Sequence, residues 1–320
     1  MGSASEPRRR SAVVSHLAHT RPRSTMVLGA LGVATSGVFV ALSGTSPSTA
    51  TFFRCLLALP LVWPLSHRER RREGRLPWRG GAVAAGAGAL FAGDALLWTR
   101  AVFEVGAGLT AVLVNAQVLL VPALALLIDR EPLPNAFLRT APLMAAGIVL
   151  TGGVFDTGAA GSAPVRGTIH AILAALCYSG FLFLLRRNGR AGWAVQSYYG
   201  VLASAAIVAL VLGTLWSDIT VTPGWSALGW LGLTAAGSQV CGWLLIGLAS
   251  PHLNSTTSAT LLLLTPVGAL ALAALVLGER PSPLQLLGCA LILASAYAAS
   301  VPNSSRHQLT GLFRRLLGSS

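Results

Sequence analysis

The sequence predicts an all-α integral membrane protein in which ten transmembrane helices form two inverted repeats of five. The first of three observations behind this prediction is composition: 53% of the residues are hydrophobic, only 10% are charged, and the mean hydropathy is +0.67. Soluble domains carry about 25% charged residues, so the composition is that of a membrane protein. Apolar runs of about 20 residues, each long enough to cross a hydrocarbon core of ~30 Å, lie at 26–43, 49–66, 80–100, 107–128, 137–155, 167–185, 195–216, 225–248, 254–277 and 283–300.

The second observation is an internal repeat. A shift of 148 positions brings 86–147 onto 234–295 without a gap. Each copy ends an apolar run on a glutamate, Glu131 or Glu279, which is followed within four residues by two prolines. Because each copy has an odd number of helices, the second copy inserts upside down relative to the first. Other identical pairs are Leu96/Leu244, Leu97/Leu245, Ala111/Ala259, Leu113/Leu261, Ala123/Ala271 and Leu127/Leu275.

The third observation is the distribution of arginine. With the N-terminus in the cytoplasm, 19 of the 23 basic residues fall in cytoplasmic segments, three fall in outer loops, and Arg54 falls within a helix. The positive-inside rule therefore places both termini in the cytoplasm. This orientation puts Glu131 inside and Glu279 outside, as inverted repeats require. The +13 net charge indicates orientation, and we expect no nucleic-acid partner.

These observations divide the chain into five segments. We expect a disordered cytoplasmic tail and a basic cytoplasmic tail at the two ends, with an amphipathic stretch at 309–317 on the inner leaflet. The four cysteines fall within predicted spans and form no CxxC or Cys/His cluster, so we expect neither a disulfide framework nor a metal site. The segments are 1–25 (tail), 26–155 (repeat 1), 156–166 (outer linker), 167–300 (repeat 2) and 301–320 (tail).

The first and third helices are rich in small residues. Gly29, Gly32 and Ser36 lie near one face of helix 26–43, and helix 80–100 carries a similar set that includes Gly88 and Gly93. In lipid, small residues allow helices to approach closely. We therefore interpret both sets as helix-packing faces.

The second and third helices each carry one charge inside the membrane. Arg54 lies about five residues, and Asp94 about six, from the outer end of its helix, which places both roughly 8–9 Å deep. An isolated charge in a span costs roughly 2.5–3.5 kcal/mol, so each needs a partner. We predict that Arg54 and Asp94 form an ion pair, either as a structural contact or as part of the substrate and coupling site.

The fourth and ninth helices carry matching polar stripes. Thr110 and Gln117, seven residues apart on one helix face, shift by 148 positions onto Ser258 and Thr265. Such a stripe in both copies indicates a shared cavity, or hydrogen bonds between neighbouring helices. Asn115 projects from another side and is interpreted as a helix–helix contact.

Aromatic residues accompany the polar ones. Trp98 follows Asp94 by four residues, and Trp243 follows Gln239 by four, so each pair shares a helix face. A carboxylate with an indole is able to hold an ammonium group by charge and cation–π attraction, although ordinary aromatic packing also explains the pattern.

Single histidine and proline residues in several helices allow more than one interpretation. His170 and Tyr178 share a face of helix 167–185, where His170 is an interfacial residue or a proton relay. Pro122 and Pro266 interrupt the fourth and ninth helices, and such breaks are tolerated where neighbouring helices or a cavity satisfy the backbone.

The segment from Gly93-Asp94-Ala95-Leu96-Leu97-Trp98 through Gly106-Ala107-Gly108 to Asn115-Ala116-Gln117 resembles a bacterial subgroup of EamA-type permeases of the drug/metabolite transporter superfamily. The resemblance covers about 26–300. It implies that helices 3, 4, 8 and 9 surround a central substrate cavity, and that Glu131 and Glu279 are structural repeat ends. The second copy departs from the first, with Gly242 at the place of Asp94, so the two repeats should contribute different chemical groups to the cavity. Candidate cavity residues are Asp94, Trp98, Thr110, Gln117, Gln239, Trp243, Ser258 and Thr265.

The sequence therefore predicts a secondary transporter, an exporter of a small neutral or zwitterionic metabolite, in a bacterial plasma membrane. Proton coupling through Asp94 is a further hypothesis, since a carboxylate in the transport path is able to bind and release a proton. Efflux of cationic drugs is the alternative. A membrane-embedded enzyme would need a cluster of catalytic side chains, which the sequence lacks, and a non-transporting scaffold is a remote alternative. We expect no cofactor; the expected partners are a small-molecule substrate and the lipid bilayer, and a homodimer stays open.

Overall fold

The computed structural model describes residues 20–130, 133, 137–156, 158–189, 193–216, 218–253 and 255–300. This part of the chain is helical throughout and contains no strand. Nine of its helices are long and apolar enough to cross a membrane, and Phe137–Thr151 is a shorter apolar helix. The predicted fold class is confirmed. Glu131 and most of the two predicted tails lie outside the described residues.

The helices follow the predicted spans closely in both repeats. We call α2 to α7 repeat 1 and α8 to α14 repeat 2. Repeat 1 consists of α2 (Pro22–Ser43), α3 (Pro47–Glu73), α4 (Trp78–Val105), α5 (Ala107–Leu113), the 3₁₀ segment η1 (Val114–Ala116), α6 (Gln117–Asp129) and α7 (Phe137–Thr151). Repeat 2 consists of α8 (Pro164–Gly189), α9 (Ala194–Leu215), α10 (Trp225–Leu233), the π-helical η2 (Thr234–Gly242), α11 (Trp243–Ala249), the 3₁₀ segment η3 (Ser250–His252), α12 (Ser255–Leu262), α13 (Leu264–Leu272), the π-helical η4 (Ala273–Leu277) and α14 (Pro283–Ser300).

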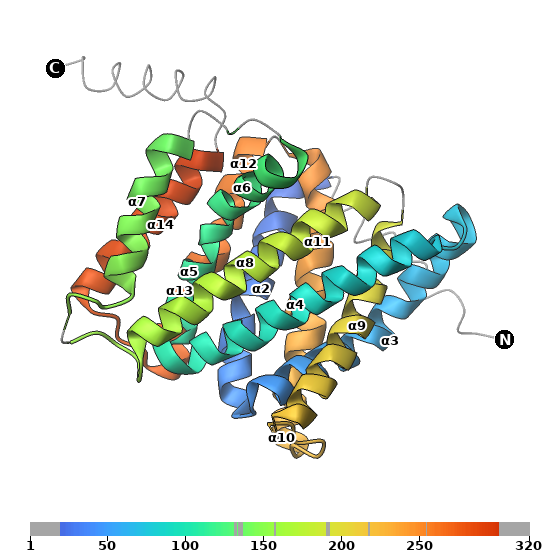
Figure 1. Cartoon of the computed structure of the whole chain (residues 1–320), viewed down its shortest axis with the longest axis horizontal. Coiled ribbons are helices and arrows are strands. Elements are labelled where there is room, and N and C mark those ends of the chain that lie inside the picture. The colour runs from blue at the N-terminus through green and yellow to red at the C-terminus, as the bar shows by residue number, and fades with distance from the viewer. Residues whose placement is uncertain are drawn as a thin grey trace.

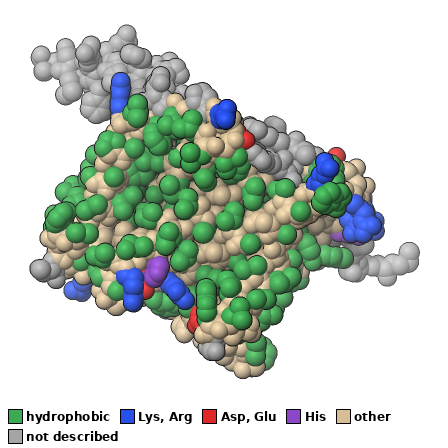
Figure 2. Space-filling model, in the orientation of Figure 1, with side chains coloured by type: hydrophobic (Ala, Val, Ile, Leu, Met, Phe, Trp, Pro, Cys, Tyr) green, Lys and Arg blue, Asp and Glu red, His purple; other side chains and the backbone are tan. Residues whose placement is uncertain are grey.

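The packing of the helices follows the inverted symmetry of the repeats. The third helix of repeat 1, α4, lies along the first helix of repeat 2, α8, and α2 lies along the α10–η2–α11 span in the reciprocal way. Equivalent spans pair with each other: α3 with α9, α7 with α14, and α5 of the fourth span with α13 of the ninth (Figure 1). Apolar side chains cover much of the surface in between, and charged side chains gather toward its edges (Figure 2).

The fourth and ninth spans are both interrupted, but only the ninth is interrupted next to its proline. In the ninth span, α12 ends at Leu262 and α13 begins at Leu264, because Pro266 lacks the amide that would bond to the carbonyl of Leu262. In the fourth span the break is η1, at Val114–Ala116, whereas α6 continues through Pro122. The prediction that Pro122 interrupts this helix is therefore wrong. The nine-residue π-helical η2 was not predicted, since no proline marks it.

Small residues allow α2 to lie directly against η2. A Cβ on Gly29 would lie 2.9 Å from the Ile246 side chain, and a Cβ on Gly242 would lie 2.8 Å from the Val33 side chain. In the other reciprocal pair, a Cβ on Gly93 would lie 3.3 Å from the Cys177 sulfur. The predicted packing role is therefore confirmed for these glycines, whereas Ser36 of the first helix lines a cavity instead.

Carboxylates fix the ends of several spans. Glu279 accepts hydrogen bonds from the amides of Ala107 and Gly108, at 2.6 and 3.1 Å, and so caps the first turn of α5. A glutamate from repeat 2 thus holds a helix of repeat 1. A carboxylate at a helix N-terminus satisfies amides that the helix itself leaves free, so the interpretation of Glu279 as a structural repeat end agrees with this contact.

The two faces of the bundle are distinguished by charge. We call the face at which α3 ends, with Arg70, Arg71 and Arg72 in its last turn, the arginine-rich face. On this face the Glu69 carboxylate caps α9 by accepting from the amides of Val195 and Gln196. On the opposite face Asp218 accepts a hydrogen bond from the hydroxyl of Ser48 in the first turn of α3, which is the equivalent position under the inverted symmetry.

Candidate functional site

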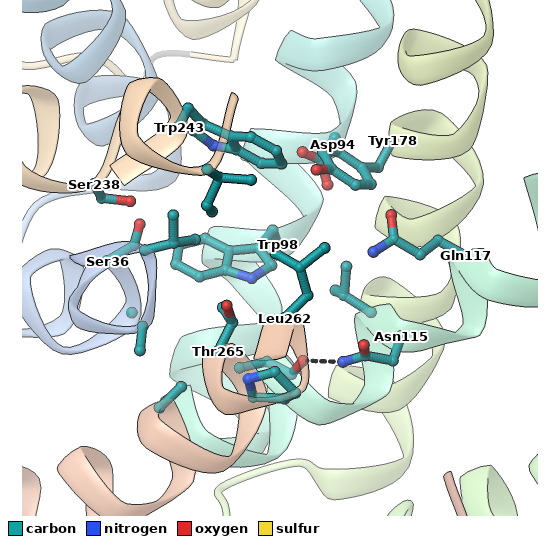
Figure 3. Close-up of a pocket in the computed structure, with 18 of the residues that line it drawn as sticks. Ser36, Asp94, Trp98, Asn115, Gln117, Tyr178, Ser238, Trp243, Leu262 and Thr265 are labelled. Atoms are coloured by element: carbon teal, nitrogen blue, oxygen red, sulfur yellow. Dashed lines mark hydrogen bonds between the residues drawn. The ribbon is translucent and has the colours of Figure 1, made fainter. Parts of the chain in front are cut away.

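A cavity of about 350 Å³ lies at the centre of the bundle. Both repeats contribute to its wall, through α2, α3, α4, α5, η1 and α6 of repeat 1 and α8, η2, α11, α12, α13 and α14 of repeat 2. The volume falls in the range of small-molecule sites, roughly 300–1,000 Å³. In Figure 3 the side chains of Asp94 and Trp98 from α4, Gln117 from α6 and Trp243 from α11 extend into the cavity.

Six of the eight predicted cavity residues line this space. The two that do not are Thr110 and Ser258. The hydroxyl of Thr110 donates to the carbonyl of Gly106 within its own helix, and the hydroxyl of Ser258 is buried with no hydrogen-bond partner among the described residues. The six that line it are Asp94, Trp98, Gln117, Gln239, Trp243 and Thr265.

The helix breaks explain why Thr110 and Ser258 do not line this cavity. Residues seven apart share a face only on a regular α-helix. The 3₁₀ segment η1 lies between Thr110 and Gln117, and the break at Leu263 lies between Ser258 and Thr265. Each break turns the second half of its span relative to the first, so only the later member of each pair faces the cavity.

Arg54 enters the cavity from α3 as a buried cation, 7% exposed. Its guanidinium lies over two aromatic rings, with Cζ 5.6 Å from the centre of Phe91 and 5.5 Å from the centre of Trp98. Its Nε and Nη1 atoms are buried without a hydrogen-bond partner in the described part of the chain. Cation–π attraction holds the group.

Asp94 extends from α4 into the same cavity and is also 7% exposed. Among the described residues its carboxylate makes no ion pair, since the ion pairs there are those of Glu104 with Arg166 and His170. The predicted ion pair between Arg54 and Asp94 is therefore not formed in this structure. The Phe91 and Trp98 rings engage the guanidinium instead, and neither Arg54 nor Asp94 has an ion-pair partner among the described residues.

Uncharged polar groups complete the wall. The Oε1 atoms of Gln117 and Gln239 are buried without hydrogen-bond partners in the described residues. The Nε2 of Gln239 donates a weak bond to the Cys55 sulfur at 3.8 Å, and the hydroxyl of Thr265 donates to the carbonyl of Ala30 at 3.3 Å. Buried acceptors without donors are unfavourable in an empty site, which makes these two amides candidates for ligand contacts.

Comparisons with known proteins agree with this architecture. The model of the EamA-like transporter family matches residues 23–153 and 165–301, which is most of the chain and includes every helix that lines the cavity. The chain belongs to the EamA-like transporter family. A protein of known crystal structure has a TM-score of 0.56 and 19% identity, with 88% of this chain and 98% of that chain covered, and supports the fold alone. No curated protein matches.

Family membership settles the broad class of activity. EamA-like proteins are transporters, so the predictions of a membrane transporter and of a protein without enzymatic activity are confirmed. The predicted family resemblance is confirmed as well. The substrate, the direction of transport and the coupling ion are matters for the proposal below.

Sequence reasoning missed several side chains of this EamA-like cavity. Asn115 was interpreted as a helix–helix contact, but it lines the cavity, and its amide donates to the carbonyls of Ala111 and Val112 in the last turn of α5 (Figure 3). This bond to its own helix helps to form the break. Ser36, Phe91, Tyr178 and Ser238 also line the wall. Their signal was weak because such residues are common in helix interfaces.

The π-helical η2 brings repeat 2 to the cavity. A π-helix turns more slowly than an α-helix and changes which residues face inward, and such segments are frequent at functional sites. Within η2, Ser238 and Gln239 line the cavity, and Trp243 follows at the start of α11. The backbone carbonyl of Gln239 accepts a hydrogen bond from the Tyr198 hydroxyl at 3.1 Å, which fixes η2 against α9.

His170 lies apart from the cavity, at the opposite face. Its Nδ1 is 2.6 Å from Glu104, which also pairs with Arg166 at 2.8 Å. These contacts join the end of α4 to the start of α8. Of the two alternatives for His170, the geometry favours the interfacial one. Among the described residues there is no group of three or more His, Cys, Asp or Glu side chains placed to hold a metal ion.

Proposed function

We propose that this transporter carries a small zwitterionic metabolite, such as an amino acid, by alternating access through the central cavity. The observation that carries the proposal is the pair of buried, unpaired charges in one cavity, the guanidinium of Arg54 and the carboxylate of Asp94. Each is unfavourable alone in a membrane interior, by roughly 2.5–3.5 kcal/mol. A zwitterion supplies one opposite charge to each and leaves the occupied cavity neutral.

The proposed contacts follow from the geometry of the two groups. Arginine recognises carboxylates by donating charge-assisted hydrogen bonds, and the guanidinium of Arg54, which lines the cavity, is the donor that we propose for the substrate carboxylate. Asp94 accepts from the ammonium group of the substrate. The indole of Trp98 or Trp243, both in the wall, adds cation–π attraction to the same ammonium.

Export, with proton antiport through Asp94, is the direction and coupling that we propose. The wall of the cavity includes Ala296 and Ser300 in the last turns of α14, toward the arginine-rich face. By the positive-inside rule this face is cytoplasmic, in a bacterial plasma membrane with both termini inside. An exporter loads its substrate from this side, and protonation of Asp94 from the outside would release the ammonium group.

The test is counterflow in proteoliposomes with three forms of one compound. These are a radiolabelled amino acid, its methyl ester, which lacks the carboxylate, and its deaminated acid, which lacks the ammonium group. We expect exchange of the amino acid alone. We expect Arg54→Gln and Asp94→Asn each to reduce it strongly, with Glu73→Gln, a change at an exposed glutamate of α3, as the control that leaves it unchanged.

Efflux of organic cations is the second candidate, because Asp94 has no ion pair and an unpaired acid is what a cation site requires. The same assay separates the two. Exchange of the methyl ester in preference to the amino acid, with a gain of activity in Arg54→Gln, would favour the cation pump. If exchange of the amino acid persists in both Arg54→Gln and Asp94→Asn, then neither residue binds the substrate, and the proposal is contradicted.

A further inference from the structure

A second cavity of about 380 Å³ adjoins the central one. It is bounded by α3, α4, α8, α9, η2 and α11 and lies toward the arginine-rich face, where Leu65, Leu185, Ala194 and Leu248 line it near the ends of their helices. Phe91, Tyr178, Gln239 and Trp243 line both spaces. We call this second space the apolar pocket.

The chemistry of the apolar pocket differs from that of the central cavity. None of its lining residues carries a charge. Of the few polar groups, the Tyr198 hydroxyl is already bonded to the carbonyl of Gln239. A ligand that fills the pocket therefore gains from removing apolar surface from water, by roughly 0.8 kcal/mol per methylene, and gains nothing from charge.

We propose that the apolar pocket holds the side chain of the substrate whose charged groups lie between Arg54 and Asp94. This inference rests on the proposed function and refines it, because it restricts the substrate to amino acids with a large apolar side chain. The shared wall is the reason for choosing this occupant over a lipid chain. Asp94 lines one space while Phe91 and Tyr178 line both, so a molecule with its ammonium at Asp94 has the pocket within reach of its side chain.

Gly247 of α11 determines how much of the pocket is free. It lines the pocket, and a Cβ at this position would meet no heavy atom within 4 Å. A larger side chain at 247 would thus fill the pocket without displacing the backbone. Gly229, on α10 of the same span, is also exposed and has no neighbour within 4 Å of a Cβ, and it lines neither space. It is the matched control.

The experiment measures counterflow rates of glycine, alanine, valine, leucine and phenylalanine at concentrations below half-saturation. For the wild type we expect the rate to rise with the apolar size of the side chain, by up to roughly fourfold per buried methylene, which is the factor that about 0.8 kcal/mol gives. We expect Gly247→Leu to reduce the phenylalanine rate at least tenfold and to leave the alanine rate within twofold of wild type. Gly247→Ala should show the same trend more weakly, and Gly229→Leu should change neither rate.

The outcomes separate this inference from the proposed function. Equal losses for alanine and phenylalanine in Gly247→Leu, or no loss for either, would overturn the side-chain pocket; the second result would assign the space to lipid chains. In both cases exchange of amino acids by the wild type would leave the proposed function standing. An absence of exchange for every amino acid, while another solute class is carried, would overturn both.

Discussion

Repeat 1 places a carboxylate, Asp94, at the position where repeat 2 has Gly242, and an amide, Gln117, where repeat 2 has the hydroxyl of Thr265. The same repeat also contributes the cation Arg54 to the cavity. Repeat 2 contributes neutral groups and two breaks in helix geometry, at η2 and at Leu263. The inverted symmetry therefore governs how the helices pack, while the chemistry of the cavity is divided unequally between the copies.

Close packing explains why the carboxylate is not repeated. A Cβ on Gly242 would lie 2.8 Å from the Val33 side chain and 3.1 Å from the Val33 amide nitrogen, so no side chain fits there. In repeat 1 the α4 helix is regular and Asp94 faces the cavity instead. The third helix of repeat 1, α4, is regular and carries a charged side chain, whereas the third helix of repeat 2 is distorted at η2 and lies close against α2.

The largest expected effect tests the charged half of the cavity against the neutral half. Asp94→Asn should raise the concentration of a zwitterionic substrate at half-saturation by about 10- to 150-fold, because hydrogen bonds to charged groups contribute roughly 1.5–3 kcal/mol. Thr265→Val removes a neutral hydroxyl and should raise the half-saturation concentration less than tenfold. The measurement is concentration-dependent counterflow. Equal losses in the two variants would break the comparison between the repeats.

The next effect concerns stability at the contact between α2 and η2. Gly242→Ala should lower the free energy of unfolding by roughly 1–3 kcal/mol, the usual range for overpacking, since its Cβ would contact Val33 at 2.8 Å. Gly237→Ala lies in the same π-helical segment, where a Cβ would meet no neighbour within 4 Å, and should change stability little. Thermal unfolding in detergent, followed by tryptophan fluorescence, compares them. Similar melting temperatures for both variants would refute the packing explanation.

These contacts also show how far the sequence alone leads. Hydropathy predicted the ten spans, and the repeat predicted their inverted arrangement, because span length and charge asymmetry are set by the bilayer and are local in sequence. Six cavity residues followed from helix periodicity combined with the family resemblance. Thr110 and Ser258 did not follow, because η1 and the break at Leu263 change the direction of the helix face, and sequence spacing does not reveal by how much.

The relation between Arg54 and Asp94 was beyond sequence reasoning for a different reason. Their similar depth in the membrane, which the sequence predicts, does bring both to one cavity. Whether they pair depends on the aromatic rings of Phe91 and Trp98, which come from α4 and lie 5.5–5.6 Å from the guanidinium. Competition between an ion pair and a cation–π contact is decided by three-dimensional geometry.

A smaller effect is expected at Glu279, which joins the two repeats. Glu279→Gln replaces one carboxylate oxygen by an NH₂ group that is unable to accept from an amide, so one of the two bonds to the start of α5 is lost. The expected destabilisation is about 0.5–2 kcal/mol, as for loss of a helix cap. The control is Glu73→Gln, since the Glu73 side chain is exposed on α3. An unchanged melting temperature would show that the cap contributes nothing to stability.

The smallest effect concerns Asp156, which belongs to the linker and therefore to neither copy. Hydrogen bonds from the Ser282 hydroxyl and from the amide of Gly158, 2.9 Å away, lower the pKa of this exposed carboxyl below its usual value. A carboxyl whose pKa is lower in the folded state stabilises the protein above its unfolded pKa of about 3.9, and this contribution is lost as the pH falls through the folded pKa.

Asp156→Asn should therefore lower the melting temperature slightly at pH 7, and the difference from wild type should shrink as the pH falls below about 3.9 and through the lower pKa of the folded protein. Melting curves of both proteins between pH 7 and pH 3 measure the difference. Because the side chain is exposed and solvent screens its contacts, the shift should stay below that of Glu279→Gln. A larger shift at Asp156 would mean that the linker, rather than the capped helix of the repeat, limits the stability of the bundle on this face.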